Sequence, residues 1–335
     1  MKRLFRVGAI AAALLFTAGT AHAAATIINP DGTVALGVND QGHLNTSVGS
    51  VAVNSSATGL AFKFPDGSFR DATSPGCFCE GWGVSVNGTT SGYANVSVDG
   101  VVNLSVSSFA STATTATSSV SLTSLPGLTV THAYSPADNA PGALFKAVVT
   151  ITNTTGATVN DLKYVRVMDW DVPLTEFNEF VTIVGTGTTT LLEKSHLNGF
   201  ATANPLSTLC DATGCGYGGV DVDVTDVGPT DHGAYFRFNF GSLAHGASYT
   251  FTTFYGAAGS AAAALAALGA EGVELYSLGQ SSPPSGDPVL GTPATYMFAF
   301  KGVGGTPIGT VPEPTSLALL GLGLVGIALA RRRRS

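Results

Sequence analysis

Two sets of acidic residues are the side chains in this sequence best suited to bind a metal ion or to transfer a proton. Asp169 and Asp171 flank Trp170 at the end of a predicted strand. Because residues two apart in a strand point to the same side, both carboxylates should lie together while the indole points the other way. The second set is Asp221, Asp223 and Asp226. Oxygen-rich loops at the edges of β-sandwiches bind calcium, so we keep calcium as a candidate ligand of both sets; the alternative is that they are solvated strand ends.

The same carboxylates could serve an enzyme. Asp169 and Asp171, with Glu176 and Glu179, could supply the acid and base of a glycosidase, which need one raised pKa and a partner about 5 to 10 Å away. Acidic pairs are also common in proteins that are not enzymes. The sequence has no G-x-S-x-G, H-E-x-x-H or G-x-x-x-x-G-K-[ST] motif. We therefore expect no enzyme, and no cofactor unless calcium binds.

Aromatic residues could bind sugars in place of metal ions. A stacking platform for sugar rings could come from Trp82, Trp170, Tyr93, Tyr164 and Tyr217. In a β-sandwich such residues more often fill the core or the strand edges.

The charge of the chain excludes several classes of protein. Only 11% of the 335 residues are charged, and seven of the 15 basic residues lie at the two ends. Residues 24–310 carry 21 acids and 8 bases, a net charge of −13. A nucleic-acid-binding protein needs many basic side chains, so the acidic body excludes that class. The 42 glycines, with many Ser, Thr and Val, favour an all-β protein with many turns.

The N-terminus reads as a secretory signal peptide over residues 1–23. Lys2, Arg3 and Arg6 precede an apolar run that is too short to cross a membrane. Ala21 and Ala23 fit the small-x-small rule of signal peptidase, so we expect cleavage after Ala23. The mature chain would then fold outside the cytoplasm.

The C-terminus has three consecutive parts over residues 311–335. Pro312, Glu313 and Pro314 are followed by an apolar segment at 315–330 and then by Arg331, Arg332, Arg333 and Arg334. The arginines should stay on the cytoplasmic side of the membrane, which leaves the body outside. This arrangement resembles the PEP-CTERM sorting signal of Gram-negative bacteria.

The resemblance implies how the chain is processed. It implies that an exosortase cleaves the tail, after signal peptidase has removed the leader. The chain would pass through Sec, be held transiently in the inner membrane, and reach the outer surface or the extracellular matrix. The alternative is a permanent C-terminal membrane anchor.

Four cysteines, Cys77, Cys79, Cys210 and Cys215, are expected to form disulfides in an exported chain. The C-x-C spacing is awkward for a bond between its own two members. We therefore favour cross-links from Cys77 and Cys79 to Cys210 and Cys215, which in the chain-entropy model would stabilise by ~4 to 5 kcal/mol. A zinc site of four thiolates is the alternative.

The body between the two ends reads as one large two-layer antiparallel β-sandwich with one short helix. Short runs of alternating apolar residues recur between turn signals. We expect strands at 33–38, 59–64, 83–87, 93–98, 101–107, 128–134, 144–152, 159–168, 179–184, 219–224, 234–240, 249–255 and 295–302. A helix is expected at 260–268, the sandwich domain at 24–302 and a flexible stem at 303–310.

These features predict an exported structural or adhesive protein of the cell surface or extracellular matrix. One alternative is a module that binds the organism's own exopolysaccharide, with the help of calcium. A second alternative is a secreted polysaccharide-degrading enzyme.

Overall fold

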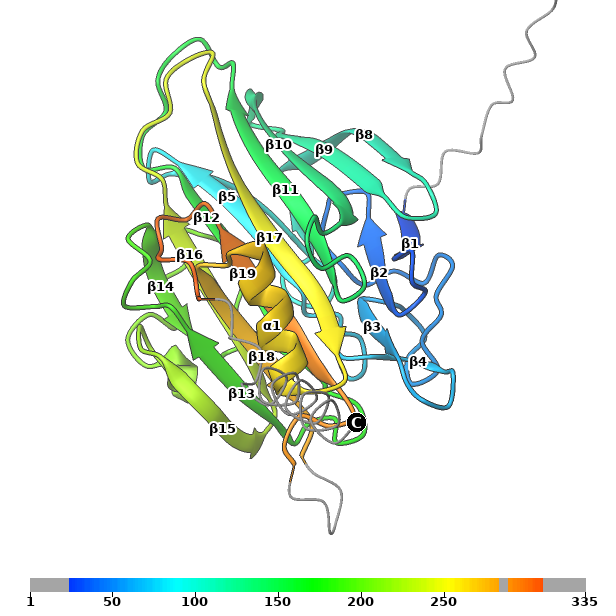
Figure 1. Ribbon diagram of the computed structural model, residues 1–335. Helices are drawn as coiled ribbons and strands as arrows, with labels where there is room; N and C mark the ends of the chain where they lie inside the picture. Colours follow the sequence, from blue (N-terminus) through cyan, green and yellow to red (C-terminus); the bar gives the residue numbers. More distant parts are fainter. Residues whose placement is uncertain (1–23, 283–288, 310–335) are drawn as a thin grey trace, which may run out of the picture.

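A computed structural model describes residues 24–282 and 289–309 of the chain (Figure 1). The predicted signal peptide at 1–23 and the predicted sorting tail at 311–335 lie outside the described residues. Within the described ranges, no helix is both long and apolar enough to cross a membrane.

The predicted all-β sandwich is confirmed, with three antiparallel sheets. The largest sheet has nine strands in the order β15 (Val224–Thr230), β13 (Glu179–Val184), β18 (Leu275–Gln280), β19 (Thr295–Lys301), β17 (Ser248–Ala258), β11 (Leu144–Asn153), β10 (Leu125–Pro136), β9 (Ala116–Leu122) and β8 (Leu104–Ser111). The second has six strands in the order β14 (Leu192–His196), β16 (His232–Asn239), β12 (Lys163–Trp170), β5 (Gly81–Val86), β6 (Thr90–Asn95) and β7 (Val101–Val102). A four-stranded sheet, which the sequence did not predict as a separate unit, joins β1 (Ala24–Ile28), β2 (Val34–Asn39), β3 (Leu60–Lys63) and β4 (Phe69–Asp71).

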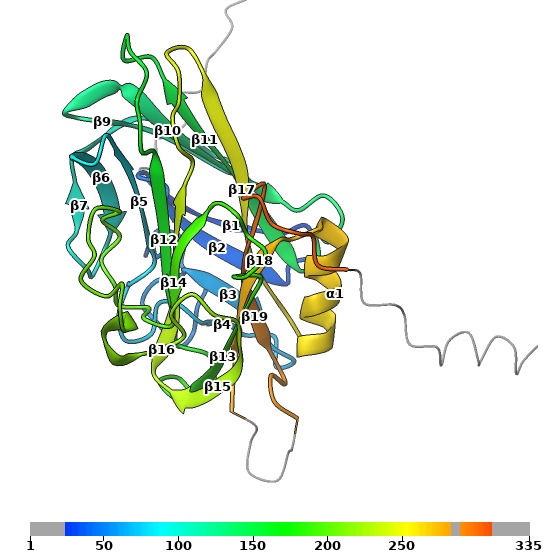
Figure 2. The ribbon, with the colours of Figure 1, turned by 90° about the vertical axis from the view of Figure 1, so that its left-hand side faces the viewer.

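One apolar core is shared by the three sheets. In the view of Figure 2, the six-stranded sheet lies to one side of β17 and β19, and the helix lies on the other side. Phe236 and Phe238 of β16 meet Phe298 and Phe300 of β19 across the gap, and all four rings are fully buried. Aromatic contacts of this kind, with rings tilted or edge to face, add to the area that they remove from water. The facing sheets are therefore held by interdigitated rings.

A polar group of residues lies at the centre of this core. Arg166 of β12 and Glu80, just before β5, form an ion pair in which both side chains are fully buried. The guanidinium also donates to the hydroxyls of Tyr134 and Tyr164, and the second oxygen of Glu80 accepts from the amide of Leu44 at 2.7 Å. A buried charge is costly unless it is paired and hydrogen-bonded, and here both charges are.

The single helix of the described part, α1 (Ala261–Glu271), covers the outer face of the nine-stranded sheet (Figure 2). Ser260 caps its N-terminus by accepting from the amide of Ala263, and Gly272 ends it in the left-handed conformation at φ 66°. Leu268 packs in one cluster with Met297 of β19. The helix predicted at 260–268 is thus confirmed and is slightly longer than expected.

The outer face of the six-stranded sheet is covered by a long loop. The alternation along residues 234–240 predicts that Tyr235 and Arg237 face water, but both are buried. Ala201 and Ala203 of the 197–223 loop pack on Val165, Val167 and Tyr235. The loop therefore buries the outward faces of β12 and β16.

Two further predictions are wrong. The strand expected at 219–224 is a turn region, because Gly218, Gly219 and Asp221 have positive φ angles that a strand excludes; β15 begins only at Val224. The stem expected at 303–310 is packed on the body over its described part. Val303 is fully buried, and the amide of Ile308 donates to the carbonyl of Val273 at 2.8 Å.

Candidate functional site

Four carboxylates meet at the covered end of β12. Asp169 lies in the last part of β12, Asp171 follows that strand, Glu179 begins β13 and Asp231 lies between β15 and β16. We call these residues the carboxylate cluster. One carboxylate oxygen each from Asp169, Asp171 and Asp231 lie within 4.8 Å of one another, and Glu179 is close enough to affect the charge of both Asp169 and Asp171.

The backbone fixes these positions from several sides. Asp169 pairs with Gly233 in the ladder between β12 and β16, which brings Asp231 near. The amide of Asp171 donates to the carbonyl of Ala72 at 2.8 Å, which holds the end of β12 against the four-stranded sheet. Gly199 lies so close that a Cβ atom there would come within 2.7 Å of Oδ1 of Asp169. The tight approach of the covering loop therefore depends on a residue without a side chain.

Most oxygens of the carboxylate cluster have no hydrogen-bond partner. Asp169 and Asp171 are each 1% exposed and Glu179 is fully buried, whereas Asp231 is partly buried. The unpartnered oxygens are Oδ1 of Asp169, both oxygens of Asp171, Oε2 of Glu179 and Oδ1 of Asp231. Glu179 uses its other oxygen to accept from the amide of His232 at 3.0 Å. Buried polar atoms are almost always satisfied in folded proteins, so this concentration of exceptions indicates a site.

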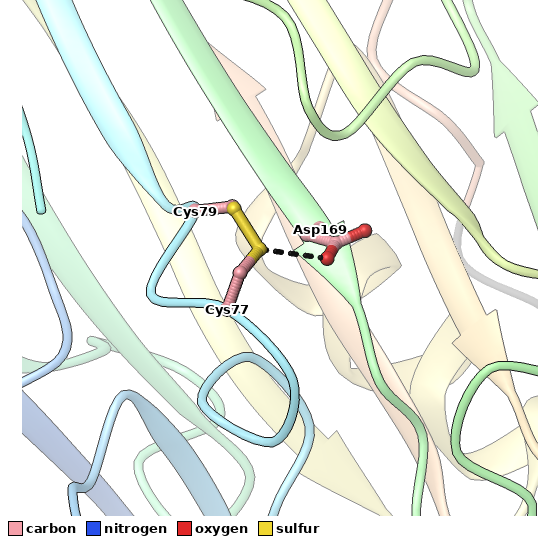
Figure 3. Close-up of side chains that lie close together, drawn as sticks. All are labelled: Cys77, Cys79 and Asp169. Carbon is pink, nitrogen blue, oxygen red and sulfur yellow. Dashed lines mark hydrogen bonds between the residues drawn. A yellow bond between two sulfur atoms is a disulfide. The ribbon is translucent and has the colours of Figure 1, made fainter. Parts of the chain in front are cut away.

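A disulfide between Cys77 and Cys79 borders the cluster (Figure 3). Sγ of Cys77 lies 3.2 Å from Oδ2 of Asp169. Because the sulfur is bonded to Cys79, it has no proton to donate to this oxygen. The contact therefore leaves the charge of Asp169 uncompensated.

The electrostatics follow from burial and from like charges. Burial raises the pKa of Asp169 well above its ordinary value, and the charges of Asp231 and Glu179 raise it further. Burial also raises the pKa of Asp171, with the charge of Asp169 as the next cause. The pKa values of Glu179 and Asp231 are raised by burial too. At neutral pH the carboxylate cluster must therefore hold protons or a cation.

The second acidic set is not part of this site. Asp221 binds Lys194 and accepts from the amide of Ser195, and Asp223 accepts from the amides of Gly185 and Thr186. Asp226 accepts from the side chains of Thr182 and Gln280. All three acids are exposed, and each is satisfied separately. These bonds fit the alternative of solvated strand-end acids, and calcium binding by this set stays a prediction.

The aromatic candidates are mostly core residues, which is the interpretation that the sequence favoured. Trp82, Tyr164 and Trp170 are fully buried in the core. The indole of Trp170 points away from the flanking carboxylates and donates to Oγ of Ser277 at 3.1 Å. Trp170 therefore cannot contact a sugar or a metal ion at this site, although its inward direction was predicted. Of the five candidate aromatic residues, Tyr217 is exposed, at 37%.

The predicted disulfide pairing is also wrong. Cys210 bonds to Cys215, so both disulfides are local and neither joins the two halves of the chain. The Cα atoms of Cys77 and Cys79 lie 5.3 Å apart, within the range that a disulfide spans. Cys210 and Cys215 close a turn in which the amide of Gly214 donates to the carbonyl of Cys210. The zinc alternative does not fit either, because the described chain has no free cysteine.

A separate cavity of about 460 Å³ lies within the loop that covers the six-stranded sheet. Its lining combines aromatic, amide and hydroxyl groups, among them Phe200, Tyr235, Asn198, Asn204 and Ser207. The imidazole of His196 stacks on Tyr235 with ring centroids 4.3 Å apart. Burial lowers the pKa of His196 to about 4, so this ring is neutral at physiological pH.

Arg237 holds the wall of this cavity in place. Its guanidinium donates twice to Asp211, once to Glu193 and once to the carbonyl of Ser207. Bidentate pairing of this kind fixes geometry as well as charge. No sequence pattern predicted the cavity, because much of its lining comes from a loop that lies over the sheet only through long-range packing.

Comparison with known proteins identifies a sorting motif at the C-terminal end of the chain. The family model of the PEP-CTERM protein-sorting motif matches residues 310–334. No curated protein matches this chain. A solved structure described as a galactose mutarotase-like protein from Lactobacillus casei is 14% identical, covers 87% of this chain and 90% of that chain, and superposes with a TM-score of 0.31. A likeness this low supports no inference about function. The chain therefore carries a PEP-CTERM protein-sorting motif at residues 310–334, which implies export, anchoring in the membrane and processing by an exosortase.

Proposed function

We propose that this chain is a non-catalytic structural or adhesive protein of the bacterial cell surface or extracellular matrix. The observation that carries the proposal is the sorting motif at residues 310–334. The body that precedes it is a large β-sandwich with two disulfides, bonds that form and persist in the oxidising environment outside the cytoplasm.

The geometry of the carboxylates supports a role without catalysis. Asp169 and Asp171, the candidate acid and base of a glycosidase, are each 1% exposed and do not line the 460 Å³ cavity. A glycosidase needs both carboxyl groups beside a scissile bond, in a cleft that admits the sugar.

The location is tested by the mass of the native protein. We expect protein recovered from the surface and matrix to lack residues 1–23 and the segment beyond Pro312. Its mass should rise by about 4 Da when its two disulfides are reduced and take up four protons. Recovery of a mass that still contains Arg331 to Arg334 would contradict processing by an exosortase.

The role in the matrix is tested by loss of the gene product. A strain without the chain should form less cohesive aggregates than its parent, and the full chain supplied in trans should restore cohesion. Unchanged cohesion would overturn the structural role without affecting the sorting assignment.

The cavity favours a second candidate function, binding of the matrix polysaccharide. Its combination of Phe200 and Tyr235 with the amides of Asn198 and Asn204 is suited to a sugar, which presents apolar ring faces and hydroxyls. Co-sedimentation with extracted matrix polysaccharide tests this function.

The Phe200→Ala variant should bind about tenfold more weakly, since an aromatic contact contributes up to ~1.5 kcal/mol. Phe177→Ala is the matched control, because Phe177 is exposed at 45% and does not line the cavity. Equal binding by both variants would exclude the cavity, and hydrolysis of the polysaccharide would favour an enzyme instead.

A further inference from the structure

We propose that the carboxylate cluster is a calcium site, with Asp169, Asp171 and Asp231 as its side-chain ligands and Glu179 beside them. The proposal is independent of the surface role above, because it rests on the oxygens at the end of β12. It concerns a bound ion of the folded body, whichever partner that body has outside the cell.

The first argument is the convergence of unpartnered oxygens. Three carboxylates, two from the end of β12 and one from just before β16, place oxygens within 4.8 Å of one another. Asp171, which is 1% exposed, has no hydrogen bond to either oxygen, and Asp169 has none to Oδ1. Ionised carboxylates that are buried without donors are unstable, unless a cation takes the place of the missing donors.

The second argument is the absence of an internal cation in this region. Within residues 24–282 and 289–309, no lysine or arginine forms an ion pair with any member of the carboxylate cluster. The imidazole of His232 is the nearest basic group, with Nδ1 at 3.7 Å from Oε1 of Glu179. Its Nε2 donates to the carbonyl of Val227 at 2.9 Å. A single imidazole does not offset four carboxylates.

The chemistry of the donors selects the ion. All available ligand atoms are carboxylate oxygens, since the neighbouring cysteine sulfurs are joined in a disulfide and are not thiolates. Hard oxygen donors select calcium or magnesium over zinc. Calcium accepts irregular sets of six to eight oxygens, including bidentate carboxylates, whereas magnesium requires a near-ideal octahedron. An irregular set of carboxylates from residues 169–171, 179 and 231, completed by waters, fits calcium better than magnesium.

An ion could reach the carboxylate cluster from the side of Asp231. This residue is only partly buried, and Thr230 before it is exposed. A surface depression lined by Tyr217 and Thr230 adjoins it. A site closed on the side of Asp169 and open on the side of Asp231 would exchange its ion with the medium.

Calcium titration of the purified full chain, freed of metal with EDTA, tests the proposal. We expect one calcium ion to bind per chain in isothermal titration calorimetry, and calcium to raise the melting temperature. The Asp171→Asn variant should bind calcium at least about tenfold more weakly. Loss of a residue that only hydrogen-bonds to a metal ligand already weakens metal binding by about this factor.

The matched control is Asp138→Asn, which makes the same change at a residue whose side chain is 68% exposed and pairs with Lys146. This control should bind calcium as the parent does. If Asp171→Asn does not fold, as judged by circular dichroism, Asp231→Asn gives the decision, because Asp231 is partly exposed. No binding at millimolar calcium by the parent, or parental affinity in the folded Asp171→Asn or Asp231→Asn variant, would overturn the proposal and leave protons as the occupants of the carboxylate cluster.

Discussion

Strand β12 has a buried ionisable residue on each of its two faces, and the two residues differ in how they are paired. Arg166 points into the core, where Glu80 neutralises it and where tyrosine hydroxyls accept its remaining protons. Asp169, three residues further along, points outward beneath the covering loop, among carboxylates of its own sign. Side chains of the protein pair the charge on the inner face, whereas the carboxylates on the outer face need a proton or a cation from the solvent. The difference indicates that the inner group supports the fold and that the outer group responds to its surroundings.

Breaking the inner pair should have the largest effect. Arg166→Met leaves Glu80 buried without a counter-charge, and we expect a loss of about 3 to 5 kcal/mol in the free energy of unfolding. Urea unfolding of the purified chain measures this loss. The double variant Arg166→Met with Glu80→Leu should recover most of it, because no unpaired charge remains. A double variant as unstable as the single one would show that packing, and not charge, is decisive there.

The outer group should make stability depend on pH when no cation is present. A carboxyl group whose pKa is higher in the folded chain than in the unfolded chain stabilises the fold fully below its unfolded pKa. This contribution is lost as the pH rises from the unfolded pKa toward the folded pKa. In EDTA the stability of the parent should therefore fall between pH 7.5 and 9, by up to about 1.4 kcal/mol per pH unit for each carboxyl that stays neutral in the fold. Thermal unfolding across this range tests the expectation, in which Asp169 and Asp171 are the acids whose pKa values are raised most.

Two further points attribute the pH dependence to the carboxylate cluster. Burial lowers the pKa of His43 to about 3 and that of His196 to about 4, so both are neutral in the folded and unfolded chain above pH 7.5 and do not contribute. Asp171→Asn should reduce the slope and should be at least as stable as the parent in EDTA at pH 9. A parental slope in this variant would mean that other groups cause the dependence.

An exposed ion pair gives the smallest expected effect and sets the scale for the other two. Lys146 and Asp138 pair at the surface, where the side chain of Asp138 is 68% exposed. Exposed pairs contribute about 0 to 1 kcal/mol because water already solvates both charges. Asp138→Asn should therefore change the free energy of unfolding by less than about 1 kcal/mol in urea titrations. If Asp138→Asn lowered the free energy of unfolding as much as Arg166→Met, burial would not explain why the two charged sites differ in their effect on stability.

The sequence predicted the parts of this molecule that depend on local patterns. Alternating apolar residues located most strands, the serine before the alanine run located the start of α1, and the spacing around Trp170 predicted which way its side chain points. The tail motif was recognisable because its three consecutive parts need no folded structure to be read.

The remainder depended on contacts between distant parts of the chain. Asp231 and Glu179 join Asp169 only because β16 pairs with β12 and β13 begins beside it. The outer face of β16 reads as exposed in the sequence, yet the 197–223 loop buries Tyr235 and Arg237. The local pairing of Cys77 with Cys79 requires a bent backbone at Phe78, because an extended one would hold the two Cα atoms farther apart than the 5.3 Å observed. None of these contacts has a periodic signal in the sequence.

The hydrogen bond between Ile308 and Val273 limits how far the sorting motif can extend from the body. Pro312 follows Ile308 by four residues, and four fully extended residues span at most about 14 Å. Ile308 is tied beside the end of α1, where its amide meets the carbonyl of Val273 at 2.8 Å. While that bond holds, an exosortase that acts at the motif has to work within about one helix diameter of the folded domain. The surface around α1 is thus the surface that the processing enzyme meets, and bulky side chains introduced there should slow the release of an otherwise well-folded protein.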